Sequence, residues 1–128
     1  IIMSTQIEYR ITPEEYLDME REAEIKSEYV EGETFAMAGA SRKHNQILAN
    51  IVRVLGNQLI EEPCSVYSSD MKVKSEKSEN YFYPDIVISC DEEQFEDEEE
   101  DILLNPIVII EILSNSTEAY DRGKKFAY

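Results

Sequence analysis

The sequence predicts a mixed α/β domain in which helices flank a central mixed β-sheet. Two N-terminal segments carry apolar residues at helical spacing, and after Pro63 the apolar period changes to two, as in strands. Three such strand segments follow one another before a last helical segment. With 128 residues the chain has room for one hydrophobic core, so we expect a single domain over residues 1–128.

A capped helix and a hairpin are expected first. Residues 12–15, Thr-Pro-Glu-Glu, combine an N-cap threonine, a proline in the first turn and a capping-box glutamate. This helix should end near Ile25. A hairpin should then turn at Glu31-Gly32, where glycine permits a positive φ.

The longest predicted helix begins after Ser41 and ends before Pro63. Its apolar residues recur every three or four positions and should form one buried stripe: Ile47, Leu48, Ile51, Val52, Leu55 and Leu59.

Three strands are expected after this helix. Residues 66–73 alternate between apolar and polar, whereas residues 83–90 and 107–113 are apolar on both faces, as in central strands. Thr117 can cap a final helix in which the chain stops. An element cut so early suggests that a C-terminal portion of the domain is missing.

The charge distribution is strongly acidic. The net charge is −16, and residues 91–101 hold nine acidic side chains in eleven positions, which is typical of a solvated, mobile loop. Without these nine the charge is still −7 (−16 + 9), so charge gives no support to nucleic-acid binding. One interpretation is that this acidic run binds protein partners.

Composition narrows the cellular setting. Cys64 and Cys90 have neither metal-ligand spacing nor the density of a disulfide framework, so we expect reduced thiols and a cytoplasmic protein. The longest apolar run is far too short to span a membrane. No glycine-rich phosphate loop is present, so no nucleotide cofactor is expected.

Two carboxylates interrupt the apolar strands. Asp85 stands in Tyr-Pro-Asp-Ile-Val-Ile, and Glu111 in Ile-Val-Ile-Ile-Glu-Ile-Leu. An unpaired buried carboxylate costs several kcal/mol or is neutralised, so two of them call for a counter-charge. Mg²⁺ suits them, because it takes one or two carboxylates together with water and phosphate oxygens. The alternative is that each acid caps a strand end or pairs with an arginine.

The surroundings of these acids resemble a known superfamily. Pro84-Asp85 followed after 26 positions by Glu111 resembles the PD-(D/E)XK nuclease signature, and residues 106–125, Pro-Ile-Val-Ile-Ile-Glu-Ile-Leu-Ser-Asn-Ser-Thr-Glu-Ala-Tyr-Asp-Arg-Gly-Lys-Lys, resemble the Uma-type restriction endonuclease family. The resemblance implies a restriction-endonuclease-like core and Mg²⁺-dependent hydrolysis of phosphodiester bonds in DNA, with Mn²⁺ as a substitute. It also implies a homodimer.

The site residues follow from the resemblance with one departure. Asp85 and Glu111 should bind the metal, and Glu28, in the hairpin, should be a third metal-binding acid unless it is a surface strand residue. The superfamily places its lysine two residues after the second acid, where this chain has Leu113. The resemblance to the Uma-type family implies that Lys125 takes the role of this lysine; Lys124 and Lys72 are alternatives.

Other residues remain open. His44 is expected mainly to cap the long helix, and Arg42 and Lys43 either contact phosphate or belong to a solvated turn. The missing lysine and the acidic charge also fit an inactive nuclease-fold protein that acts as a binding or regulatory module.

Overall fold

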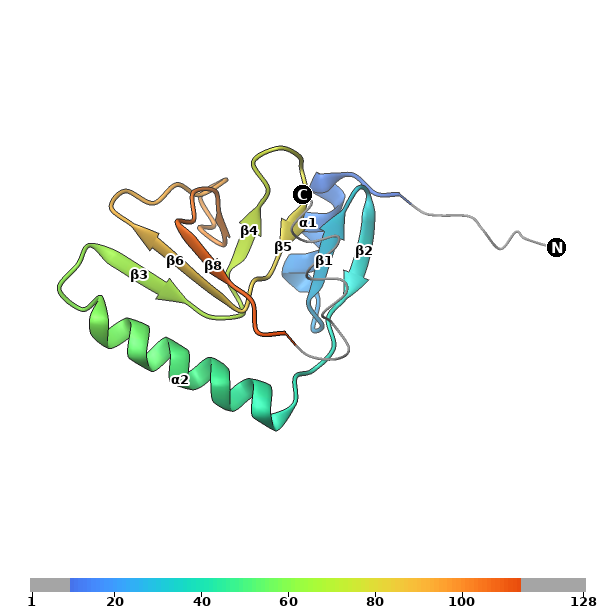
Figure 1. Cartoon of the computed structure of the whole chain (residues 1–128). Helices are drawn as coiled ribbons and strands as arrows, with labels where there is room; N and C mark the ends of the chain where they lie inside the picture. The colour runs from blue at the N-terminus through green and yellow to red at the C-terminus, as the bar shows by residue number, and fades with distance from the viewer. Residues whose placement is uncertain (1–9, 114–128) are drawn as a thin grey trace.

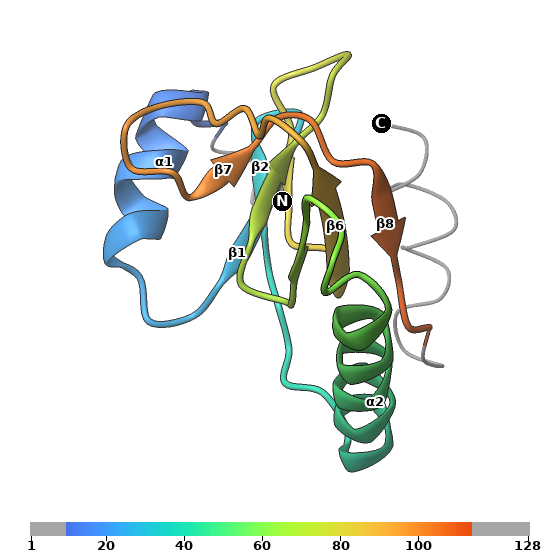
Figure 2. The same ribbon diagram turned by 90° about the vertical axis from the view of Figure 1, so that its left-hand side faces the viewer.

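The computed structural model describes residues 10–113, which form two helices and eight strands in two sheets (Figure 1). The helices are α1 (Pro13–Glu22) and α2 (Arg42–Gln58). The strands are β1 (Ser27–Val30), β2 (Glu33–Ala36), β3 (Cys64–Tyr67), β4 (Lys72–Lys74), β5 (Tyr81–Phe82), β6 (Ile86–Cys90), β7 (Ile102–Leu103) and β8 (Val108–Ile110). The two helices lie on opposite sides of the molecule (Figure 2).

Helix α1 begins as predicted. The Thr12 hydroxyl accepts from the Glu15 amide at 3.1 Å, and the Glu15 carboxylate accepts from the Thr12 amide at 2.9 Å, which completes the capping box. The helix ends at Glu22, three residues before the expected end. Its buried side chains, Tyr16 and Leu17, pack into a core cluster with residues of the neighbouring sheet.

The five-stranded sheet has the order β2-β1-β5-β4-β7. Its first three pairings are antiparallel and β4 pairs with β7 in parallel, so the sheet is mixed, as predicted. The β1–β2 turn holds Glu31 at φ 50° and Gly32 at φ 86°. Glycine adopts this left-handed conformation without the steric penalty of a Cβ, so the expected hairpin is confirmed.

The three-stranded antiparallel sheet has the order β3-β6-β8, and α2 runs beside it against β3 (Figure 1). The helix is confirmed, with Ser41 accepting from the His44 amide at 3.2 Å as its N-cap. The expectation of a buried apolar stripe is wrong, because no side chain of α2 is fully buried and Ile47 is 40% exposed. The stripe is only half-covered because its main packing partner within residues 10–113 is the short strand β3. Neither described helix combines the length and the apolar character that a membrane crossing needs.

The predicted strands are divided between the two sheets. The expected strand 66–73 becomes β3 and β4, separated by a turn that the Met71 amide closes on the Ser68 carbonyl at 3.2 Å. The expected strand 83–90 becomes only β6, while β5 ends just before it. Pro84, which has no N–H to give to a ladder, lies at this crossing between sheets. The apolar periodicity predicted that these segments form strands, but it did not predict where the strands are interrupted.

Strand β8 differs from the predicted central strand. Within the described residues it pairs only with β6 and is an edge strand, with Val108 and Ile109 each 41% exposed. Strand β6, by contrast, is central and buried along four of its five residues, as expected. An apolar run in the sequence does not show whether a strand is central or at an edge, because neighbouring elements of the fold decide which strands are buried.

The two cysteines form a disulfide, so the expectation of reduced thiols is wrong. Cys64 begins β3 and Cys90 ends β6, and the antiparallel register pairs them directly. The two cysteines are 26 residues apart, and this spacing in the sequence does not by itself indicate a disulfide. The register of the sheet brings them together.

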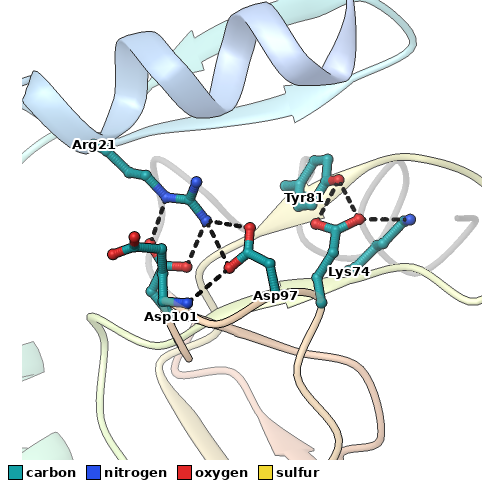
Figure 3. A network of polar contacts seen from close by, with 7 residues as sticks. Arg21, Lys74, Tyr81, Asp97 and Asp101 are labelled. Atoms are coloured by element: carbon teal, nitrogen blue, oxygen red, sulfur yellow. Dashed lines mark hydrogen bonds and ion pairs between the residues drawn. The ribbon is translucent and has the colours of Figure 1, made fainter.

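Several acids of residues 91–101 contact the body of the molecule. Arg21 of α1 binds Asp97 and Asp101 at 3.0 and 2.9 Å (Figure 3). Glu96 accepts from Lys74 at 2.8 Å and from the Tyr81 hydroxyl. The Arg21 hydrogen bond, as the leading cause, lowers the pKa of Asp101. At these points the segment is held by basic and hydroxyl partners; its mobility elsewhere stays a prediction.

Candidate functional site

Asp85 and Glu111 flank the same end of the β6–β8 ladder. The last register pair joins Ile86 to Ile110; Asp85 directly precedes Ile86 and Glu111 directly follows Ile110. The Ile112 amide donates to Asp85 Oδ2 at 2.7 Å, which confirms that the two chain segments stay adjacent beyond the ladder.

Asp85 has a second neighbour in His44. The imidazole Nε2 lies 3.3 Å from Asp85 Oδ2, and both side chains are 16% exposed. With the proton on Nε2, the ring donates to the carboxylate. No arginine among residues 10–113 contacts Asp85, so in this part of the chain the arginine pair named as the alternative does not form; a histidine and a backbone amide contact the carboxylate instead.

Both contacts of Asp85 use one oxygen. Within residues 10–113 its Oδ1 accepts no hydrogen bond, while Oδ2 is fixed by Ile112 and His44. The carboxylate is therefore oriented by protein donors on one side and presents its other oxygen for a further ligand.

Sequence reasoning underrated His44. Its amide does take part in the N-cap, but its ring reaches across to the three-stranded sheet. The available signal was its position: His44 precedes Leu48, Ile51 and Leu55 at spacings of four, seven and eleven, so it belongs to the half-covered face of α2. A polar ring on that face needs a polar partner in the sheet.

Glu28 is buried, so the surface-residue alternative is wrong. Its side chain in β1 is 2% exposed, and Oε2 accepts from the Tyr83 amide at 2.7 Å. Tyr83 stands two residues before Asp85 in the crossing between sheets. Glu28 thus holds the backbone that leads into the Asp85 position.

The candidate lysines fall in different places. Lys124 and Lys125 lie outside the described residues. Lys72 is 3% exposed, with its ammonium 5.7 Å from the ring centroids of Tyr16 and Tyr83, and burial lowers its pKa. These contacts direct Lys72 toward α1. Leu113, at the usual lysine position, is 38% exposed.

The donor set matches a hard divalent cation in type. Carboxylate and backbone carbonyl oxygens are the ligands that Mg²⁺ accepts, and it keeps several waters when only two carboxylates are present. No cluster of three or more histidine, cysteine or acidic side chains that could hold a metal occurs within residues 10–113.

The chain thus combines a mixed five-stranded sheet, a three-stranded sheet and two helices, with Asp85 and Glu111 next to the paired strands β6 and β8. A crystallised "putative nuclease belonging to DUF820" from Anabaena variabilis has the same fold, with a TM-score of 0.71 over 91% of this chain and 66% of that one, at 23% identity. Residues 13–128 match the family Uma2, described as "Putative restriction endonuclease". The chain belongs to the Uma2 family.

Two relatives from Synechocystis sp. (strain ATCC 27184 / PCC 6803 / Kazusa) cover most of this chain. The uncharacterized protein sll1609 is 35% identical over 128 residues, 100% of this chain and 71% of its own length. The uncharacterized protein slr1290 is 36% identical over 117 residues, 91% of this chain and 60% of its own length. The chain thus spans only part of the length of its relatives.

Proposed function

We propose that this chain carries the site of a Mg²⁺-dependent endonuclease that hydrolyses phosphodiester bonds in DNA. The observation that supports the proposal is that Asp85 and Glu111 flank the same end of the β6–β8 ladder, where the Ile112 amide donates to Asp85. Membership of the Uma2 family, described as "Putative restriction endonuclease", supports the same reaction class.

Each residue has a role in this proposal. Asp85 and Glu111 hold the cation, and His44 with the Ile112 amide fixes the orientation of the Asp85 carboxylate. When bound, Mg²⁺, or Mn²⁺ in its place, activates a water molecule and stabilises charge on the phosphate oxygens. Glu28 supports the site as a third acid, and Lys125 orients the attacking water.

The cellular setting belongs to the same proposal. The substrate is DNA, the protein acts in the cytoplasm without a nucleotide cofactor, and a homodimer presents two sites to the two strands. Because the chain spans 71% and 60% of its two relatives, these properties concern the whole protein.

An inactive nuclease fold that binds or regulates is the second candidate. Leu113 stands where the superfamily signature has lysine, and a net charge of −16 repels a phosphate backbone at long range. Under this alternative the protein retains Asp85 and Glu111 but does not cleave DNA.

The test is cleavage of supercoiled plasmid DNA with Mg²⁺ by the wild type, Asp85→Asn and Glu111→Gln. We expect each variant to lose roughly 100-fold or more, equivalent to about 3 kcal/mol of transition-state stabilisation. Asp70→Asn is the matched control, because its side chain is 88% exposed and pairs with Lys26 on the surface.

The outcomes separate the two candidates. Cleavage that needs Mg²⁺ and is retained by Asp70→Asn supports the endonuclease. Equal residual cleavage by the wild type and the two site variants rejects it and leaves the binding module.

A further inference from the structure

Helix α2 is the basic element of an acidic chain. Its residues, Arg42–Gln58, include Arg42, Lys43 and Arg53 and no aspartate or glutamate, so the helix carries a formal charge of +3. The whole chain has a net charge of −16. A segment of 17 residues without one acid is therefore a strong local reversal of charge.

The three bases of α2 are all exposed, and none forms an ion pair with a carboxylate of residues 10–113. Arg53 makes one weak side-chain bond, to Asn50 on the same helix at 3.3 Å. Bases elsewhere in the described range are mostly engaged: Arg21, Lys26 and Lys74 bind acids, and Lys72 is buried. Unused cationic charge thus gathers on α2.

These bases share the outer side of the helix. Arg42 and Arg53 are eleven residues apart, or three turns, so they lie in one row about 16 Å long. The residues between and beside them in that row are uncharged and exposed: Gln46, Ala49, Asn50 and Asn57. Lys43 flanks the row at its N-terminal end. The opposite side of α2 holds His44 and the half-covered apolar stripe.

The N-terminal turn of α2 lies next to the candidate site, because His44 in that turn contacts Asp85. Arg42 and Lys43 belong to the same turn and are exposed on its outer side. At the other end of α2, Glu61 and Glu62 are exposed and acidic. A polyanion is therefore attracted at the site end of the helix and repelled beyond its C-terminus.

We propose that the outer face of α2, formed by Arg42, Lys43 and Arg53, binds the phosphate backbone of the nucleic-acid substrate. The inference rests on the proposed nuclease function and adds the surface that positions the substrate. Phosphate contacts of this kind set register without reading sequence, and amide side chains such as Gln46 and Asn50 supplement the cations.

The experiment measures binding of a fluorescein-labelled duplex oligonucleotide by anisotropy over a series of KCl concentrations. All proteins carry Asp85→Asn, so that binding is recorded without cleavage. The variant Arg42→Gln/Lys43→Gln/Arg53→Gln should bind roughly tenfold or more weakly than the parent at low salt. The reason is that contacts between basic side chains and phosphates release counterions from the DNA, and this release drives binding. The slope of log K against log salt should fall by about 1 for each lost contact.

Lys43→Gln and Lys77→Gln form the matched pair of single variants. Both lysines are exposed, and both substitutions change net charge equally, but Lys77 lies in the β4–β5 turn between Glu76 and Glu79. Lys43→Gln should weaken binding and Lys77→Gln should not. Circular dichroism verifies that each variant keeps its helix content.

Two results overturn the inference and are distinguishable. If the triple variant binds with unchanged affinity and salt slope while the wild type cleaves with Mg²⁺, the α2 surface is rejected and the endonuclease stands. If the Asp85→Asn parent does not bind the duplex and the wild type does not cleave plasmid with Mg²⁺, both proposals fail.

Discussion

At the residue scale, Asp85 is held by two donors from separate elements. His44 comes from α2 and Ile112 follows β8, so the carboxylate joins the helix to the edge of the three-stranded sheet. Hydrogen bonds to a carboxylate are stronger than those between neutral groups, so these two donors fix the orientation of the half-buried Asp85 side chain.

The lysine of the site can be assigned by substitution. Lys125→Met should abolish plasmid cleavage, and Lys124→Met and Lys72→Met should retain most of it. For Lys72 the physical reason is its contact with the Tyr16 and Tyr83 rings, which directs its ammonium toward α1. Steady-state cleavage rates at saturating DNA measure the effect.

Stability of the same three variants supplies the control. Burial lowers the pKa of Lys72, so its charged form is costly in the folded state, and Lys72→Met should leave the urea midpoint unchanged or raised. Loss of cleavage in Lys72→Met together with an active Lys125→Met contradicts this assignment.

At the element scale, β6 joins the two principal features of its sheet. Asp85 precedes its first residue, and Cys90, its last residue, is bonded to Cys64 of β3. The Cys64–Cys90 bond and four register pairs tie β3 to β6, whereas β8 follows β6 over three pairs. The acid is thus carried by the best-anchored strand of the three-stranded sheet.

Removal of the disulfide should destabilise the domain without removing its site. For a loop of 26 residues the chain-entropy relation gives about 3.5 kcal/mol of unfolding free energy at 25 °C. Cys64→Ser/Cys90→Ser, compared with the oxidised wild type by urea unfolding, should show a loss of this order. Cleavage measured well below the midpoint should persist.

A thiol titration of the unfolded wild type without reductant provides the control. It should find no free thiol, since Cys64 and Cys90 are bonded and are the chain's two cysteines. Two titratable thiols, with equal stability of wild type and variant, would contradict the bond.

At the scale of the whole molecule, the core beneath α1 is built from tyrosines. Tyr16 stacks on Tyr29 with ring centroids 5.0 Å apart, and Tyr81 lies 5.5 Å from Tyr16. Burial, as the leading cause, raises the pKa of Tyr16, Tyr81 and Tyr83. The second cause for Tyr81 is its hydrogen bond to Glu96, and for Tyr83 its hydrogen bond to Glu20.

Stability should therefore fall in alkaline solution. In the folded protein these tyrosine hydroxyls have a raised pKa and stay protonated. In the unfolded chain, where tyrosine has a pKa of about 10, the same hydroxyls ionise at lower pH. Their stabilising effect is complete below about pH 10 and is lost as the pH rises above it. Urea midpoints on either side of this pH measure the loss, and Tyr81→Phe should give a shallower decline than wild type.

The comparison of wild type with Tyr81→Phe isolates the phenol. Lys72 acts in the opposite direction. Its pKa is lowered in the folded state, so the unfolded chain holds the proton to higher pH and stability rises with pH. Both proteins contain Lys72, so its contribution cancels when their declines are compared. Identical declines in the two proteins would refute the assignment to Tyr81.

Much of the fold was predictable from local signals. The Thr12 capping box, the Ser41 N-cap and the turn at Gly32 each depend on a few neighbouring residues, and all three are confirmed. The mixed α/β class also followed, because apolar periodicity records which faces turn inward. The site pair could be suspected because Asp85 and Glu111 interrupt apolar runs; their catalytic roles stay predictions.

The sequence alone therefore determined the two helices within residues 10–113, the strand-forming segments and the two acids that stand out beside them; the helix expected after Thr117 lies outside the described residues. Only the tertiary structure decided how those segments divide into two sheets, that Cys64 meets Cys90, that Glu28 is buried and that His44 reaches Asp85. The reason is that local propensity acts over a few residues, whereas register and cover are set by contacts between residues 26 to 55 positions apart.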